Sequence, residues 1–328
     1  MSKRILAYRR LNDHQLDQLR SQFHVDYFDK LESPDDPAFR EALSQAHGLI
    51  GAGVTMTPEL LDAAPNLEAI ASISVGVDNY SVDELTTRGI LLCNTPDVLT
   101  ETTADTGFSL IMASARRVVE LADYVRRGDW KSSIGPEQFG SDVHGKTLGM
   151  VGFGRIGQAI ARRGALGFGM KILYAKASPK PDLEAELGAR RCELDELLQQ
   201  SDFVCAIVPL TPETRQLIGA REFELMKESA IFINISRGQV VDEQAMIQAL
   251  ESGQIRGAGL DVFEQEPLQS DSPLPRMPNV VALPHIGSAT HETRTAMAQR
   301  AVDNMMLALD GKRPLSPVNE EAWGDKLN

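Results

Sequence analysis

The sequence predicts an α/β fold of two domains, each built around a parallel sheet. Short apolar runs typical of buried strands alternate with helical patterns, and this alternation occurs in two separate series along the chain. A length of 328 residues is enough to form two hydrophobic cores. A long helical pattern lies between the two series, and a glycine-rich turn follows the first strand of the second series.

The first series occupies about the first hundred residues. Its expected strands are 5–8, 48–51, 67–73 and 90–93. Helices are expected over 12–23, after an Asn or Asp cap, and over 58–63, with proline in the first turn. These elements form a βα module that is separate from the second series.

A long helix is expected next, over roughly 102–127. Apolar residues from Phe108 to Val125 keep the i, i+3, i+4, i+7 spacing of one helical face, and Thr102 with Asp105 can form a capping box. This helix is expected to connect the two domains.

The second series predicts a doubly wound parallel sheet, because most of its strand-like runs are separated by helical patterns. The expected strands are 148–151, 171–174, 203–208, 230–235, 257–260 and 280–283. A last helix, over about 290–309, is expected near the end of the chain.

The bulk properties exclude several classes of partner. The net charge of −13 argues against nucleic acids and anionic membranes, since both require a basic face. No apolar run approaches the length of a membrane span, and the first residues lead directly into a strand without a signal-peptide pattern, so a cytoplasmic protein is expected. Cys93, Cys192 and Cys205 lack metal or disulfide spacing and are expected to be reduced, and no metal site is predicted.

The glycine-rich turn has the form G-x-G-x-x-G and lies between a predicted strand and a predicted helix. Gly152 is suited to the tight turn, Gly154 lets a pyrophosphate approach the backbone, and Gly157 allows close helix–strand packing. The backbone N–H groups at the helix start, at Arg155 and Ile156, would face the phosphates. The turn predicts a Rossmann dinucleotide site; a glycine-rich turn without a ligand is the alternative.

Charged side chains stand just past the ends of three predicted strands. Arg237, Asp261 and His285 each follow a buried run, and Glu266 lies on the loop that leaves the strand before Asp261. Because the carboxyl ends of parallel strands form the ligand crevice of such a sheet, these side chains are expected to converge there with the glycine turn.

Together these motifs resemble the D-isomer-specific 2-hydroxyacid dehydrogenase family. The matching stretches are 152–157, 234–242, 260–268 and 284–290. Within the family, 95–102 and 133–136 are most similar to glyoxylate/hydroxypyruvate reductases and 2-ketogluconate reductases. Four linked motifs are far more specific than any single one of them.

The resemblance implies how the domains are assembled. It places residues 1–99 and 289–328 in a flavodoxin-like substrate domain, which is the catalytic domain, and residues 100–288 in the dinucleotide-binding domain. It also implies a homodimer, with 130–139 at the subunit contact, and substrate binding by the backbone N–H groups of Val75 and Gly76.

Reduction of a 2-keto acid requires a hydride, a proton for the carbonyl oxygen and a cation for the carboxylate. Arg237 has the fork of donors that binds a carboxylate and polarises the adjacent carbonyl. His285 is the expected proton donor, because an imidazole with an ordinary pKa of roughly 6.5 suits proton transfer at neutral pH. Glu266 is expected to accept from the other ring nitrogen and to stabilise the imidazolium.

The expected cofactor contacts lie mostly at the strand ends of the dinucleotide-binding domain. They are Thr106, Gly152, Gly154, Arg155, Ile156, Gly157, Lys176, Ser178, Pro209, Ile235, Asp261 and Gly287. For Asp261 two roles remain open: contact with the nicotinamide side of the site, or anchoring of a loop.

The segment after the second strand of this domain predicts a preference for NADP, as NADPH, over NAD. A carboxylate at this place would bind the 2′-hydroxyl of the adenosine ribose and repel a 2′-phosphate, but none occurs before Asp182. Lys176, Ser178 and Lys180 are available to bind that phosphate, and one charge-assisted hydrogen bond is worth roughly 1.5–3 kcal/mol. Solvated lysines in an NAD-dependent protein are the alternative.

Two other functions are considered. Some non-enzymatic dinucleotide-sensing proteins that bind a partner share this architecture, and a reductase of another 2-keto acid could use NADH. Formate dehydrogenase activity is disfavoured because that relative has glutamine in place of Glu266, and phosphoglycerate dehydrogenase activity by the absence of the ribose carboxylate. Arg9, Arg10 and Arg294 either reach a longer or phosphorylated sugar acid or are solvated.

Overall fold

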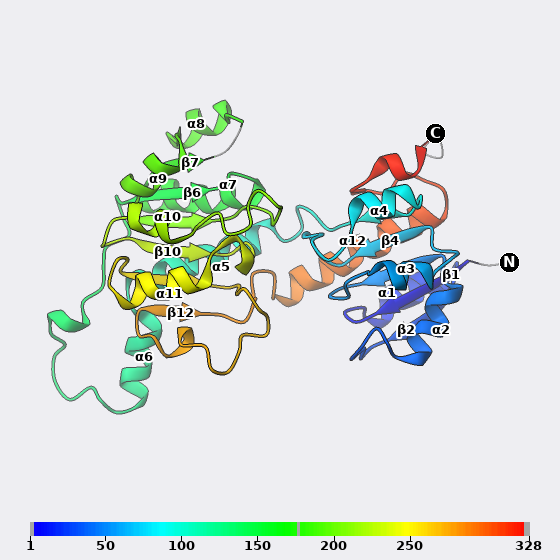
Figure 1. Ribbon diagram of the computed structural model, residues 1–328, viewed down its shortest axis with the longest axis horizontal. Coiled ribbons are helices and arrows are strands. Elements are labelled where there is room, and N and C mark those ends of the chain that lie inside the picture. Colours follow the sequence, from blue (N-terminus) through cyan, green and yellow to red (C-terminus); the bar gives the residue numbers. More distant parts are fainter. Residues whose placement is uncertain (1–2, 176–177, 325–328) are drawn as a thin grey trace. The chain divides into compact units, whose positions relative to one another are not determined.

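The computed structural model describes residues 3–175 and 178–324. The chain divides into two compact units, one formed by Met1–Leu99 with Ala289–Asn328 and the other by Thr100–Ser288 (Figure 1). Each unit contains one parallel sheet, so the predicted α/β class with a doubly wound sheet and a second sheet-based domain is confirmed.

The sheet of the first unit has the strand order β2-β1-β3-β4-β5. Its strands are β1 (Arg4–Tyr8), β2 (His24–Phe28), β3 (Gly48–Gly51), β4 (Ala69–Ser72) and β5 (Leu91–Cys93). The register pairs Leu6 with Leu49 and Leu49 with Ile70. Strand β2 was not predicted, because it lies at the edge of the sheet and is only partly buried, so its sequence lacks an apolar run.

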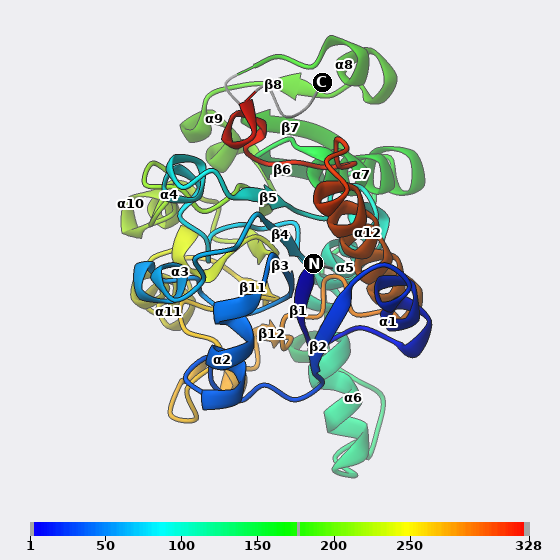
Figure 2. The same cartoon turned by 90° about the vertical axis from the view of Figure 1, so that its right-hand side faces the viewer.

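Helices cover both faces of this sheet. They are α1 (Asp13–Arg20), α2 (Pro37–Gln45), α3 (Pro58–Asp62), α4 (Val82–Thr87) and α12 (His291–Leu309), with a 3₁₀ turn at Glu320–Ala322. Helices α2, α3 and α4 lie on one face, where Phe39, Leu61 and Leu85 join one apolar cluster, and α1 and α12 lie on the other (Figure 2). Asn12 caps α1, as the sequence predicts, and also forms a capping box with Gln15.

The single long helix expected over 102–127 is wrong. The structure has two helices, α5 (Thr100–Ala115) and α6 (Val118–Arg126), separated at Arg117, whose φ of +53° is left-handed and ends the first helix. Helix α5 packs against the sheet of the second unit, whereas α6 has no buried residue. In Figure 1, α6 and the loop that follows it extend away from that sheet.

The sheet of the second unit has the strand order β12-β11-β10-β9-β6-β7-β8, with all pairs parallel. The strands are β6 (Thr147–Val151), β7 (Lys171–Ala175), β8 (Arg190–Arg191), β9 (Phe203–Ala206), β10 (Ile231–Asn234), β11 (Gly257–Leu260) and β12 (Val280–Ala282). The six predicted strands are present, and the short edge strand β8 was not predicted. The chain order reverses between β6 and β9, which is where ligands bind in doubly wound sheets.

Apart from α6, the helices of this unit form a layer on each face of the sheet. They are α5, α7 (Arg155–Arg162, continued by a π turn at Arg163–Gly167), α8 (Pro181–Leu187), α9 (Leu194–Gln200), α10 (Ala220–Leu225) and α11 (Glu243–Glu251), with 3₁₀ turns at Pro136–Gln138, Gly238–Val240 and Leu274–Arg276. Alternate strand residues point to opposite layers. Ile231 and Ile233 pack into the cluster with α5 and α7, and Phe232 packs into the cluster with α9, α10 and α11. A fully buried side chain of this size stabilises the fold by about 1.5–3 kcal/mol.

Cys93, Cys192 and Cys205 are free thiols, and burial raises the pKa of Cys93 and of Cys205 to about 12. Within residues 3–175 and 178–324, no helix is both long enough and apolar enough to cross a membrane.

Candidate functional site

The residues predicted to carry the chemistry lie at the carboxyl edge of the second unit's sheet. Arg237 follows β10, Asp261 follows β11, and His285 follows β12. These three strands are adjacent and parallel, so their carboxyl ends lie side by side. Arg237, Glu266 and His285 are called the His285 cluster below.

The best-defined contact of the cluster joins His285 and Glu266. His285 Nδ1 lies 2.7 Å from Glu266 Oε2, and the two side chains are 45% and 34% exposed. A carboxylate only accepts, so Nδ1 carries the proton and Nε2 faces away from the pair. This geometry leaves one ring nitrogen for a substrate.

Glu266 is held as an anion by its surroundings. Its other carboxylate oxygen accepts the backbone N–H of Phe263 at 3.1 Å. Burial acts to raise the pKa of Glu266, but the hydrogen bond and charge of His285, the Phe263 amide and the charge of Arg237 together bring the pKa below its ordinary value. The positive charge of Arg237 therefore acts on the same carboxylate.

Asp261 anchors the loop that carries His285. It is 1% exposed, and its two carboxylate oxygens accept the backbone N–H groups of Ile286 at 2.7 Å and of Gly287 at 2.8 Å. Burial raises the pKa of Asp261, although the two amides act in the opposite direction. Of the two roles left open for Asp261, loop anchoring is the one that these hydrogen bonds support, and a contact of Asp261 with the cofactor stays a prediction. His285 itself has a left-handed φ of +53°.

The loop that carries Arg237 is organised by Asn234, which the sequence reasoning did not assign to the site. Asn234 Oδ1 accepts from Ser236 N at 3.0 Å and from Ser236 Oγ at 2.8 Å, and Asn234 Nδ2 donates to Arg237 O at 3.1 Å. Arg237 is half-buried and donates to Ser236 O at 2.8 Å. An asparagine inside the apolar run of the predicted strand 230–235 was the available signal, because such a buried side chain must bond nearby backbone.

The glycine turn has the geometry that a pyrophosphate requires. Gly152 has a φ of +98°, and a Cβ there would lie 2.6 Å from Ile207 O. A Cβ on Gly157 would lie 2.9 Å from Gly152 O, whereas one on Gly154 would meet nothing within 4 Å. Space is therefore open in front of α7, which begins at Arg155 and presents its first N–H groups there. The residues present fit a dinucleotide.

The end of β7 would face the adenosine ribose. Tyr174 is fully buried and stacks on Phe153 of the glycine turn, with ring centroids 4.3 Å apart. Its hydroxyl donates to Glu184 and accepts from Lys180 N at 2.9 Å. Ser178 is exposed. Lys176, the other predicted phosphate ligand, lies outside the described residues.

The remaining predicted contacts fall in both units. In the second unit, Thr106 lies half-buried on α5, Ile235 is buried directly after β10, and Pro209 is exposed after β9. In the first unit, Val75 and Gly76 follow β4 and are half-buried; Val75 O accepts from the side chain of Asn94 at 2.9 Å.

Three arginines of the first unit lie near one another. Arg9 and Arg10 follow β1 with left-handed φ values of +54° and +62°, and Arg294 lies in the first turns of α12. Arg9 donates to the carbonyl of Leu31. Burial and the charges of Arg294 and Arg9 lower the pKa of Arg10.

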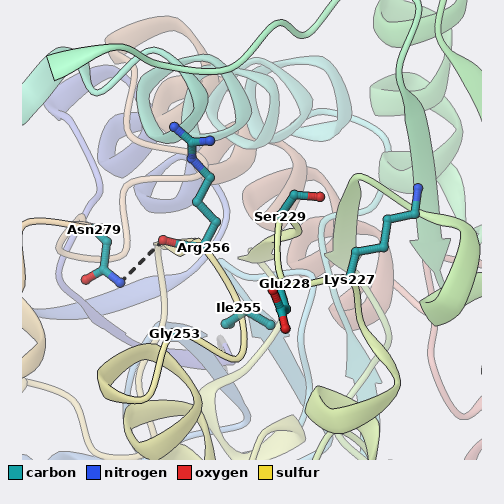
Figure 3. A pocket seen from close by; sticks show the side chains of 7 residues that line it. All are labelled: Lys227, Glu228, Ser229, Gly253, Ile255, Arg256 and Asn279. Carbon is teal, nitrogen blue, oxygen red and sulfur yellow. Dashed lines mark hydrogen bonds between the residues drawn. The ribbon is translucent and has the colours of Figure 1, made fainter. Parts of the chain in front are cut away.

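A pocket elsewhere in the second unit is separate from this site. Figure 3 shows its lining residues, which precede β10, β11 and β12 and therefore lie at the amino end of the sheet. Asn279 donates there to Arg256 O at 3.4 Å. Among the described residues, no group of three or more His, Cys, Asp or Glu side chains is placed to hold a metal ion.

A glycine turn at the switch point of a doubly wound sheet, with a carboxylate-bound imidazole and a guanidinium at neighbouring strand ends, defines the class: a nicotinamide-dependent dehydrogenase. The family model of the D-isomer specific 2-hydroxyacid dehydrogenase NAD-binding domain matches residues 108–287. The chain belongs to this family, which confirms the predicted resemblance.

Two curated relatives are similar along almost the whole chain. A glyoxylate/hydroxypyruvate reductase B of Escherichia fergusonii is 53% identical over 321 residues, covering 98% of this chain and 99% of the relative. The protein of the same name from Klebsiella pneumoniae strain 342 is 52% identical over the same shares of both chains.

Solved structures are similar as well. An NADPH-dependent glyoxylate/hydroxypyruvate reductase of Sinorhizobium meliloti, in complex with NADP and malonate, is 34% identical with a TM-score of 0.87, covering 98% of both chains. A Thermus thermophilus protein is 43% identical with a TM-score of 0.89, covering 96% of this chain and 99% of that one.

Proposed function

We propose that the protein reduces a small 2-keto acid to the D-2-hydroxy acid with NADPH, and that its substrate is glyoxylate, hydroxypyruvate or 2-ketogluconate. The observation that carries the proposal is the 2.7 Å contact between His285 Nδ1 and Glu266 at the sheet edge where Arg237 also lies. The names of the Escherichia and Klebsiella relatives support the first two substrates.

In this reaction each member of the His285 cluster has one task. Arg237 binds the substrate carboxylate and polarises the neighbouring carbonyl. His285 donates a proton from Nε2 to the carbonyl oxygen, because Nδ1 is occupied by Glu266. Glu266 stabilises the imidazolium before the transfer and holds the Nδ1–H tautomer after it. A bound nicotinamide supplies the hydride.

The proposed ligands of the cofactor are the glycine turn with the start of α7, and the segment after β7. The open space at Gly154 supports the first, and the absence of a carboxylate at Ala175, the last residue of β7, supports NADPH over NADH. The NADP complex of the Sinorhizobium relative is consistent with this choice. The proposed further contacts of the substrate carboxylate are the N–H groups of Val75 and Gly76.

The proposal divides the chain by role. The unit of Thr100–Ser288 is proposed to bind the dinucleotide, and the unit of Met1–Leu99 with Ala289–Asn328 to bind the substrate. Substitutions at the carboxyl ends of the strands are expected to affect different Michaelis constants. In the dinucleotide-binding unit they would raise KM for NADPH, and in the substrate-binding unit KM for the keto acid.

A homodimer in the cytoplasm completes the proposal. Large apolar side chains on α6 and in the loop after it are exposed: Val118, Val119, Val125, Trp130, Ile134 and Phe139. Exposed apolar side chains grouped on one segment of the chain are typical of a subunit contact. Light scattering is expected to give twice the 35.9 kDa chain mass, and the monomer mass would contradict this part.

The function is tested by following NADPH oxidation with keto acids of two to six carbons. Turnover of glyoxylate or hydroxypyruvate, with a higher kcat/KM for NADPH than for NADH, is expected. A clear preference for NADH would contradict the cofactor assignment. No turnover across the panel, with retained NADPH binding, would favour a non-enzymatic dinucleotide sensor.

A further inference from the structure

The loop that carries Arg237 and the loop that carries Glu266 touch through one peptide bond. A Cβ on Gly238 would lie 1.8 Å from the carbonyl carbon and oxygen of Phe263 and 2.2 Å from Glu264 N. Only a glycine allows the two backbones to come this close. The residue after the guanidinium is therefore packed directly against the peptide that leads to the carboxylate.

Both backbone polar groups of Glu264 are bound by side chains from the Arg237 side of this contact. Gln239 Nε2 donates to Glu264 O at 2.7 Å, and Glu264 N donates to Glu243 Oε2 at 3.0 Å. Gln239 lies in the 3₁₀ turn Gly238–Val240 and Glu243 is the first residue of α11. These two hydrogen bonds are called the Glu264 contacts below.

The Glu264 contacts lead to the imidazole through a short chain of bonds. Two residues after Glu264, Glu266 turns back so that Oε1 accepts Phe263 N, and Oε2 accepts His285 Nδ1. The carboxylate of Glu266 is about one-third exposed, so burial alone does not fix its place. The backbone of 263–264 is the support that sets its position.

We propose that Gln239 and Glu243 are positioning residues for proton transfer. By holding the Glu264 peptide, they keep the carboxylate of Glu266 in hydrogen-bond contact with His285. They also couple the loop that carries Glu266 to the loop that carries Arg237. The kinetic consequence rests on the proposed function. A displacement of about 1 Å in such a support is enough to lower a rate up to about 100-fold.

Glu266 contacts His285 directly, Asp261 interacts electrostatically with His285 and Glu266, and the charge of Arg237 acts on Glu266. Of these, Asp261 is fixed by the amides of Ile286 and Gly287 in the His285 loop, and Arg237 belongs to the loop that carries Gln239. Loosening the Glu264 contacts therefore changes chiefly the distance from Glu266 to the imidazole. A weaker carboxylate contact destabilises the imidazolium relative to the neutral ring.

The test compares Gln239→Met and Glu243→Met, which cannot form the Glu264 contacts, with Glu243→Gln, which keeps an acceptor oxygen. We expect the double Met variant to lower kcat about tenfold at pH 8, to shift the descending limb of the reduction profile to lower pH, and to leave KM for NADPH unchanged. Glu243→Gln is expected to retain the wild-type profile. A wild-type profile in the double variant would overturn the proposal, as would a Glu243→Gln profile equal to that of Glu243→Met.

A second measurement does not depend on turnover. The imidazole nitrogen signals of His285, followed by NMR in the protein without ligands, are expected to titrate at lower pH in the double Met variant. Asn279→Ala serves as the control, because it removes the side-chain–backbone bonds to Leu250 O and Arg256 O at the opposite end of the sheet (Figure 3). The control is expected to leave the titration unchanged. An unchanged titration in the double variant overturns the positioning role even if no keto acid is reduced.

Discussion

The two halves of the second unit's carboxyl edge are built in different ways. Around β10, β11 and β12, side chains fix the loops: Asn234, Asp261 and Glu266 each bind backbone N–H groups. Around β6, the missing side chains of Gly152, Gly154 and Gly157 determine the geometry. Proton transfer therefore needs groups held in place, whereas phosphate binding needs backbone that no side chain covers.

The largest expected effect is that of His285→Gln. Glutamine can still donate a hydrogen bond to Glu266 but cannot transfer a proton, so kcat for glyoxylate reduction is expected to fall about 1,000-fold. Binding of NADP, measured by calorimetry, is expected to remain within about twofold, because the glycine half is unaffected. A loss of kcat below about tenfold would contradict the role of His285.

Arg237→Lys is expected to lower kcat/KM for glyoxylate about 100-fold. Lysine keeps the charge but not the planar pair of donors that binds a carboxylate and faces its neighbouring carbonyl. The loop itself should persist, because Asn234 binds the backbone of residue 237 rather than its side chain. The thermal unfolding midpoint serves as the control, and equal activity of the lysine variant would show that a simple positive charge is sufficient.

Two matched substitutions in the glycine turn are expected to separate cofactor binding from stability. Gly154→Ala adds a methyl group in open space at an ordinary φ of −76°, so stability is expected to stay near that of the wild type while KM for NADPH rises about tenfold. Gly152→Ala places the same methyl group 2.6 Å from Ile207 O at a φ of +98°, so it is expected to cost about 1–3 kcal/mol of stability. If both variants lose stability equally, Gly154 has a structural role instead.

Much of this sheet edge could be predicted from the sequence, but only where a local pattern specifies it. The glycine turn and the strand-end positions of Arg237 and His285 follow from local patterns, because strands and tight turns are specified within a few residues. The break at Arg117, the edge strand β2 and the contacts of Gln239 and Glu243 with Glu264 were missed. A left-handed arginine, a half-exposed strand and a contact across more than twenty residues leave no periodic signal.

The smallest expected effect concerns stability in acid. The folded pKa of Glu266 is below its ordinary value of roughly 4.3, so ionised Glu266 stabilises the fold above that pH, and this stabilisation is lost as the pH falls through the folded pKa. Glu266→Gln removes the titration. The difference in urea midpoint between wild type and variant is therefore expected to be largest at pH 7 and to shrink between about pH 5 and pH 3. The pKa of Asp261 is raised, so ionisation of Asp261 lowers the stability of the fold. Asp261→Asn is therefore not expected to remove a stabilising charge in this pH range, although it removes an acceptor for one loop amide. A gap for Glu266→Gln that stays constant with pH would mean that its hydrogen bonds, rather than its charge, hold the His285 loop.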